Sequence, residues 1–131
     1  MKKKLLGLTG CLALAFLLMA AKGNDGVISK ENGVYVVNTT TLASDVEGYI
    51  GATPLKIYIQ KNKIVKIEAL KNQETPKYFA KIKKQMLDKW NGMTVKDAQK
   101  AHVDGVTGAT ISSDAVKENV KRGLDYYQKH K

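Results

Sequence analysis

The chain has 131 residues, about the length of one domain, with 22 basic and 12 acidic side chains and a formal net charge of +10. This charge favours anionic partners such as a phosphate, an acidic protein or a lipid surface. The lysines are spread along the chain with no arginine–aromatic motif, so charge alone supports nucleic-acid binding, and it is not expected if the protein is exported.

The first 23 residues have the pattern of an export signal. Three lysines, residues 2–4, precede an uncharged apolar run over residues 5–21. Residues 21–23, Ala-Lys-Gly, fit a cleavage site, and an uncleaved membrane anchor is the alternative. Cys11 follows Leu-Thr-Gly, so lipidation there is a further alternative. We expect location in the periplasm or on the outer face of the membrane. Cleavage near residue 23 would leave 18 basic and 12 acidic residues, no cysteine and no disulfide.

The next part of the chain predicts a small sheet. Residues 24–32 are polar and predict a linker or frayed terminus. Residues 34–40 are rich in β-branched side chains, and apolar and polar residues alternate over 55–60 and again over 65–69. Lys61-Asn62-Lys63 predicts a tight turn between the last two strands. The three strands predict an antiparallel meander.

Helical spacing dominates the rest of the chain. A helix should begin at Pro76 and end at Asn91-Gly92, with Tyr78 and Trp90 in a core stripe rather than in a ligand platform, the alternative. A short helix over 94–101 and a final helix over 113–128 follow. The order predicts an α+β domain over residues 33–131, a small antiparallel sheet with helices packed on one face.

The junction before the final helix, DGVTGATISSDAVKENV over residues 104–120, has more small residues than a helix cap needs. Ser112 or Ser113 can cap the helix, and Asp114 favours its dipole. A cap does not account for residues 107–110. The free N–H groups at the start of a helix bind phosphate, and the Thr110 hydroxyl lies beside them.

Other site chemistries have little support in the sequence. His102 and His130 are the only histidines, and no cluster has metal-ligand spacing, so no protein-held metal is expected. A serine hydrolase has little support, because Ser112 and Ser113 have no base nearby in sequence. His102 would have to approach them in the folded chain. The junction also lacks the Gly-Lys-Ser/Thr ending of a nucleotide-binding P-loop.

Residues 104–110, Asp-Gly-Val-Thr-Gly-Ala-Thr, with Ile-Ser after them, resemble the flavinylation motif of FMN-binding domains, Asp-x-x-Ser/Thr-Gly-Ala-Thr. These domains are related to the covalent-flavin subunits of Na⁺-translocating quinone reductase and Rnf complexes. Glu74-Thr75-Pro76 is similar to the Glu-Thr-Pro-Gly loop of the family, which lies near the flavin ring. The resemblance covers roughly residues 48–128.

The resemblance implies FMN as the cofactor, joined to Thr110 by a phosphodiester bond and donated from FAD by an exported, Mg²⁺-dependent flavin transferase. The motif also implies phosphate-binding or transferase-recognition roles for Asp104, Thr107, Gly108 and Ala109. The Ser112 that follows the motif, and Glu74 and Thr75 of the loop near the ring, are expected to bind the cofactor as well. Lys77 stands where the family has glycine. Two consequences are open: its side chain changes how closely this loop approaches the ring, or its positive charge lies near the flavin and favours the reduced anion.

We therefore expect an exported electron carrier, with redox partner proteins or a quinone-linked membrane complex as partners, rather than an enzyme with its own substrate. One alternative is an exported non-redox binding module for an anionic surface or polymer. Another keeps FMN but binds it without a covalent bond.

Overall fold

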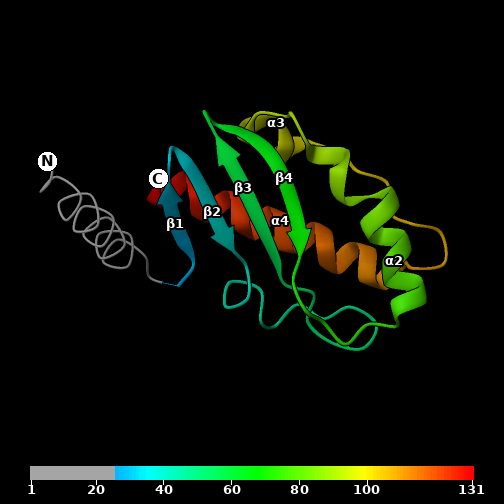
Figure 1. Cartoon of the computed structure of the whole chain (residues 1–131). Helices are drawn as coiled ribbons and strands as arrows, with labels where there is room; N and C mark the ends of the chain where they lie inside the picture. The colour runs from blue at the N-terminus through cyan, green and yellow to red at the C-terminus, as the bar shows by residue number, and fades with distance from the viewer. Residues whose placement is uncertain (1–25) are drawn as a thin grey trace, which may run out of the picture.

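The computed structural model describes residues 26–131, so the predicted export signal and Cys11 lie outside the described residues. One four-stranded antiparallel sheet has the order β1-β2-β3-β4, and α4 crosses one of its faces (Figure 1). This arrangement confirms the predicted α+β class with a small antiparallel sheet. The elements are β1 (Ile28–Glu31), β2 (Val34–Asn38), β3 (Leu55–Gln60), β4 (Lys63–Ala69), α2 (Pro76–Gln85), the 3₁₀ helix η1 (Leu87–Trp90), α3 (Val95–Lys100) and α4 (Thr110–His130).

Strand β1 corrects the prediction of a linker over residues 24–32. It pairs with β2 in the register Ile28↔Val37, and Ile28 is buried. The connection is a two-residue turn, Asn32-Gly33, in which both residues have positive φ (54° and 82°). An Asn-Gly pair is the preferred sequence of such a hairpin turn. The Asn-Gly pair was therefore a sequence signal for an additional strand before β2, and our prediction of a linker overlooked it.

The core lies between the sheet and α4. The apolar residues of β3, Leu55, Ile57 and Ile59, are fully buried, because alternate residues of a strand face the same side. From α4, the buried residues Val116, Val120 and Leu124 belong to the same cluster. The final helix was predicted over 113–128 and spans Thr110–His130, so it begins inside the motif.

Helix α2 is shorter than predicted, since it ends at Gln85 and a separate 3₁₀ turn, η1, follows. Phe79, Ile82 and Met86 are buried, as is Trp90 at the end of η1. Tyr78 is 48% exposed, so its assignment to the core stripe is wrong. A helix rotates by about 100° per residue, which turns Tyr78 away from the buried face that contains Phe79.

A buried polar network fixes the long segment between β2 and β3 onto α4. The Asn119 amide nitrogen donates hydrogen bonds to the Thr53 hydroxyl (3.3 Å) and the Ala115 carbonyl (2.9 Å). The Thr39 hydroxyl donates to the Asn119 side-chain oxygen and accepts from the backbone N–H of Leu55 (2.9 Å). Both ends of the segment are thereby held, and its middle reaches the start of α4. Within residues 26–131, no helix combines the length and apolar character needed to cross a membrane.

Candidate functional site

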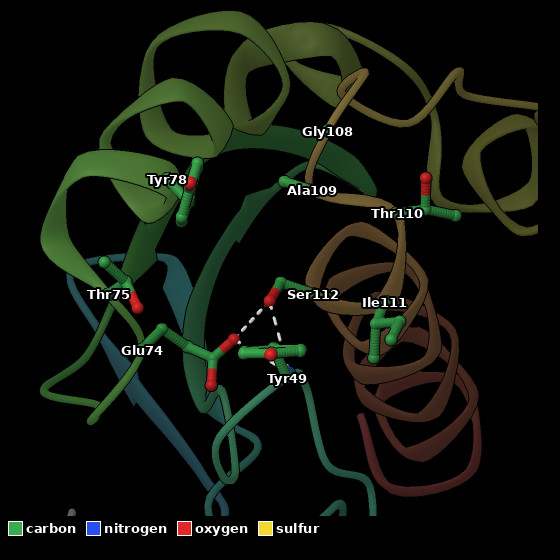
Figure 2. A pocket seen from close by; sticks show the side chains of 9 residues that line it. All are labelled: Tyr49, Glu74, Thr75, Tyr78, Gly108, Ala109, Thr110, Ile111 and Ser112. Carbon is green, nitrogen blue, oxygen red and sulfur yellow. Dashed lines mark hydrogen bonds between the residues drawn. The ribbon is translucent and has the colours of Figure 1, made fainter.

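A pocket of about 450 Å³ opens where three segments meet at one end of the sheet. Figure 2 shows side chains entering from the β2–β3 segment, from the start of α2, and from the loop that leads into α4. The lining residues are Tyr49, Glu74, Thr75, Tyr78, Gly108, Ala109, Thr110, Ile111 and Ser112. The pocket thus joins both sequence features singled out above, the motif and the Glu-Thr-Pro segment.

One wall of the pocket is built around the Glu74 carboxylate. It accepts hydrogen bonds from the backbone N–H groups of Tyr49 (3.0 Å), Ile50 (2.6 Å) and Gly51 (3.0 Å). It also accepts a hydrogen bond from the Ser112 hydroxyl, at the start of α4. We call this arrangement of Glu74, Ser112 and the backbone of residues 49–51 the clasp. It holds three distant segments together with one charged group.

Burial of the Glu74 side chain, which is 6% exposed, by itself raises the pKa of its carboxyl group. The hydrogen bond from Ser112 and those from Ile50, Gly51 and Tyr49 stabilise the ionised form and outweigh burial. The pKa of Glu74 therefore lies below its usual value, and the clasp contains a carboxylate. Because its oxygens already accept four hydrogen bonds, Glu74 acts in the structure as a positioning group.

Gly48 makes the clasp possible by leaving room for it. A Cβ atom at this position would lie 2.6 Å from Glu74 Oε1 and 3.2 Å from Ser112 Oγ. Carbon atoms do not approach oxygen so closely, and the Glu74 side chain is fixed by its hydrogen bonds. The next glycine, Gly51, has nothing within 4 Å of such an atom. Of these two glycines, only Gly48 is therefore required by the packing around the clasp.

The motif forms a tight turn that delivers the chain into α4. The N–H of Ala109 donates to the Val106 carbonyl (2.9 Å), and Gly108 has a φ of 85°. Positive φ at the third position is the pattern of a type II turn, which favours glycine there. The Ser113 hydroxyl accepts from the N–H of Val106 (2.9 Å) and closes the turn from behind. We call residues 106–109 the motif turn.

The predicted helix cap is wrong. The N-cap residue of α4 is Ala109, and no side chain caps this helix. Ser112 belongs to the clasp and Ser113 to the motif turn, so neither hydroxyl is available to the first N–H groups. The first intrahelical bond is from the N–H of Ser113 to the Ala109 carbonyl. The positive end of a helix of 21 residues therefore remains open to an anion.

Thr110 is the first residue of α4 and lies at the rim of the pocket. Its side chain is exposed. Figure 2 shows its hydroxyl pointing away from Glu74 and Ser112. A hydroxyl that is exposed beside an uncapped helix start is accessible to an enzyme and lies next to a phosphate-binding position.

The other predicted site residues divide into two groups. Thr75, Gly108, Ala109 and Ser112 line the pocket with Thr110 and Glu74, whereas Asp104 and Thr107 are exposed and lie outside its lining. Asp104 approaches His102 at 3.7 Å, with both side chains about nine-tenths exposed. Lys77 is exposed in the first turn of α2 and is also outside the lining.

Three apolar pocket residues were missed as site residues. Tyr49, Tyr78 and Ile111 are 74%, 48% and 55% exposed. The position of Tyr78, about 100° around the helix from Phe79, was a usable signal. Within the described part of the chain, no group of three or more His, Cys, Asp or Glu side chains could hold a metal ion.

Comparison with known proteins gives one match. A family model described as FMN-binding domain matches residues 48–125, more than half of the chain. The matched region begins at Gly48 and includes the clasp, the pocket lining and the motif turn. No curated protein and no solved structure matches the chain.

Proposed function

The chain belongs to the FMN-binding domain family, with FMN as its cofactor, and from this premise we propose that it is an exported electron carrier holding FMN covalently on Thr110. The observation that carries the proposal is the state of the Thr110 hydroxyl. It is exposed at the uncapped start of α4 and at the rim of the pocket, while its neighbour Ser112 is buried in the clasp.

The attachment is a group transfer from FAD. The Thr110 oxygen attacks the phosphorus of the FMN half and forms a phosphodiester bond. The bond to the bridging oxygen of the pyrophosphate breaks, AMP leaves, and a base of the transferase removes the hydroxyl proton. Mg²⁺ bound by the transferase neutralises the phosphates. The uncapped N–H groups at the start of α4 would hold the phosphate of FMN and favour its negative charge.

The pocket fits a flavin ring in its chemistry. Two tyrosines and Ile111 supply flat and apolar surface, and the single charged residue of the lining, Glu74, is occupied in the clasp. We expect Tyr49, Tyr78 and Ile111 to contact the ring, with Glu74 positioning Tyr49. Bound FMN supplies one- and two-electron transfer, and the chain holds the ring at an open site.

Export and an electron-carrier role fit together with covalent attachment. A cofactor held by a bond is retained outside the cytoplasm, where FMN lost by dissociation is not replaced. The basic, apolar N-terminal 23 residues motivate the export part of the proposal. The expected partners are the transferase during maturation and redox proteins or a quinone-linked membrane complex afterwards.

Intact mass tests the proposal. After co-expression with an active flavin transferase, FAD and Mg²⁺, the protein should gain the mass of FMN less one water, retained in denaturant. Trypsin should place the gain on residues 101–117, and fragmentation should distinguish Thr110 from Thr107, Ser112 and Ser113. Thr41→Ala, at an exposed threonine outside the motif, is the matched control and should be modified normally.

The two alternatives give different results in the same experiment. FMN that is lost in denaturant would support non-covalent binding, and would overturn the attachment. A colourless protein that binds an anionic polymer would support a non-redox module. The pocket lining contains no lysine or arginine, which argues against an anionic polymer in this site.

A further inference from the structure

One side of the exposed surface of α2 is basic. Within this helix Lys77, Lys81 and Lys84 are spaced i, i+4 and i+7, which places them on one side. Phe79 and Ile82 occupy the opposite, buried side. We call the three lysines the α2 stripe. The stripe is solvent-facing because the buried residues face the core.

The α2 stripe is not neutralised by its surroundings. Residues 71–90 contain six lysines and two acidic residues, of which Glu74 is buried in the clasp. This short segment therefore supplies a net charge of +4 out of +7 for residues 26–131. Within that described range, no stripe lysine forms an ion pair, whereas Lys66, Lys117, Lys121 and Arg122 do.

An apolar patch lies at the pocket beside this helix. Five large apolar side chains are exposed in residues 26–131, and four of them are Tyr49, Ile50, Tyr78 and Ile111. Three of the four line the pocket, and Ile50 follows Tyr49 in the clasp. Tyr78 lies on the same helix as the stripe (Figure 2). An apolar centre with a charged rim is typical of a protein-binding surface.

From this arrangement we infer that the α2 stripe and the apolar patch form the docking surface for a redox protein with an acidic face. The inference rests on the proposed function and adds the chemistry of the partner. Complementary charge steers such encounters and raises their rates, and interfaces for electron transfer are small and transient.

A protein partner fits this surface better than a lipid surface does. Three of the four apolar residues, Tyr49, Tyr78 and Ile111, line a pocket that a flat bilayer surface does not enter. Whatever exchanges electrons at the pocket must also bring a redox group to its mouth. A partner seated on the α2 stripe covers Tyr78 and so reaches that mouth.

Stopped-flow reduction of the flavin-loaded protein tests the surface, with loading established beforehand by mass. The probe is reduced flavodoxin, a strongly reducing and acidic protein. The test variant is Lys81→Glu/Lys84→Glu, since neither residue lines the pocket. The matched control is Lys96→Glu/Lys100→Glu, which makes the same charge change at exposed residues of α3.

We expect the α2 variant to slow reduction by flavodoxin on the order of tenfold at about 0.01 M salt. At about 0.15 M, where the Debye length is about 8 Å, the difference should shrink. The α3 variant should change the rate much less. Reduction by the cationic radical of methyl viologen should not slow in the α2 variant, which shows that its flavin remains reducible.

Equal slowing by the two variants would mean that only net charge matters and would overturn the inference. An unchanged rate in the α2 variant, with loss of binding to vesicles containing phosphatidylglycerol, would assign the surface to lipid instead. If the chain takes up no flavin, amide NMR titration with oxidised flavodoxin decides. Shifts confined to α2 and residues 49–50 support the surface, and their absence overturns it independently of the proposed function.

Discussion

The wall and the rim of the pocket use the same kind of side chain in opposite ways. Ser112 in the wall is 6% exposed, and its hydroxyl donates to Glu74. Thr110 at the rim, two residues earlier, is exposed and starts the helix. Residues two apart on a helix point in directions about 200° apart. The comparison teaches that the environment, and not the residue type, decides which hydroxyl is structural and which is open to chemistry.

Alanine substitutions that remove each hydroxyl test the difference between Thr110 and Ser112 most directly. Thr110→Ala should abolish FMN attachment and change the free energy of unfolding by no more than about 0.5 kcal/mol, because the side chain is exposed. Ser112→Ala should keep attachment but cost about 1.5–3 kcal/mol, since a buried carboxylate loses a hydrogen bond. Intact mass and urea unfolding measure the two effects. Unfolding of the domain by Thr110→Ala would contradict the distinction.

The steric requirement for glycine at position 48 can be tested by comparing alanine substitutions at Gly48 and Gly51. Gly48→Ala should destabilise the protein by about 1–3 kcal/mol, because its Cβ would lie 2.6 Å from Glu74 Oε1. Gly51→Ala has open space at the same atom and should be nearly neutral. Thermal unfolding of both variants gives the difference. Equal midpoints would show that Glu74 moves aside without cost.

The back of the motif turn depends on Ser113. Ser113→Ala should cost about 1–2 kcal/mol, because the buried N–H of Val106 loses its acceptor. Attachment at Thr110 should persist. Ser44→Ala, at an exposed serine, is the control and should be silent in urea unfolding. If Ser113→Ala abolishes attachment while stability is unchanged, Ser113 belongs to the chemistry and not to the turn.

Acid should destabilise the folded protein by protonating Glu74 in the wall of the pocket. The pKa of Glu74 is lowered in the folded protein, so the unfolded state binds the proton more readily and stability rises with pH. The contribution is complete above the unfolded value of about 4.3 and is lost as pH falls through the lower folded value. Urea midpoints between about pH 3 and pH 7 should show this loss in the wild type. Glu74→Gln should be less stable at neutral pH, and its urea midpoint should vary less with pH than that of the wild type. Parallel pH dependences of the two proteins would mean that Glu74 does not cause the loss of stability in acid.

The smallest expected effect concerns Lys77, which is exposed and outside the pocket lining. Lys77→Gly should lower the midpoint potential of the loaded protein by at most a few tens of mV, because exposed charges interact by about 1 kcal/mol or less. The shift should shrink with salt. Lys77→Arg keeps the charge and is the control. An unchanged potential at low salt would mean that this charge does not reach the ring.

Much of the fold could be predicted because its signals are local. The alternation over 55–60 depends on neighbours in sequence, and it predicts the buried face of β3 that the structure has. Strand β1 was missed because four mixed residues give a weak pattern, although the Asn32-Gly33 turn marked it. The break of the predicted long helix at Gln85 also had no clear sequence signal.

The site was less predictable because its key contacts are long-range. The motif marks Thr110, and the structure adds that this hydroxyl is exposed at an uncapped helix start. No local pattern joins Glu74 to the backbone of residues 49–51 or to Ser112, 38 positions further along the chain. The Glu74 carboxylate accepts hydrogen bonds from main-chain N–H groups, which nearly every residue type has, so the sequence of residues 49–51 does not reveal the contact. For the same reason Tyr49 could not be placed at the pocket in advance.

The direction of α4 has a practical consequence for attaching the protein to an electrode. A helix of 21 residues spans about 30 Å, and it runs from Thr110 at the pocket to the C-terminus. Figure 1 shows the described chain beginning at β1 on that same far side, while α2 and the start of α4 lie opposite. A linker at either end would therefore immobilise the domain with its pocket facing the solution. Direct electron transfer from the electrode to the flavin would instead require the pocket to face the electrode, which a surface cysteine introduced near α2 could achieve.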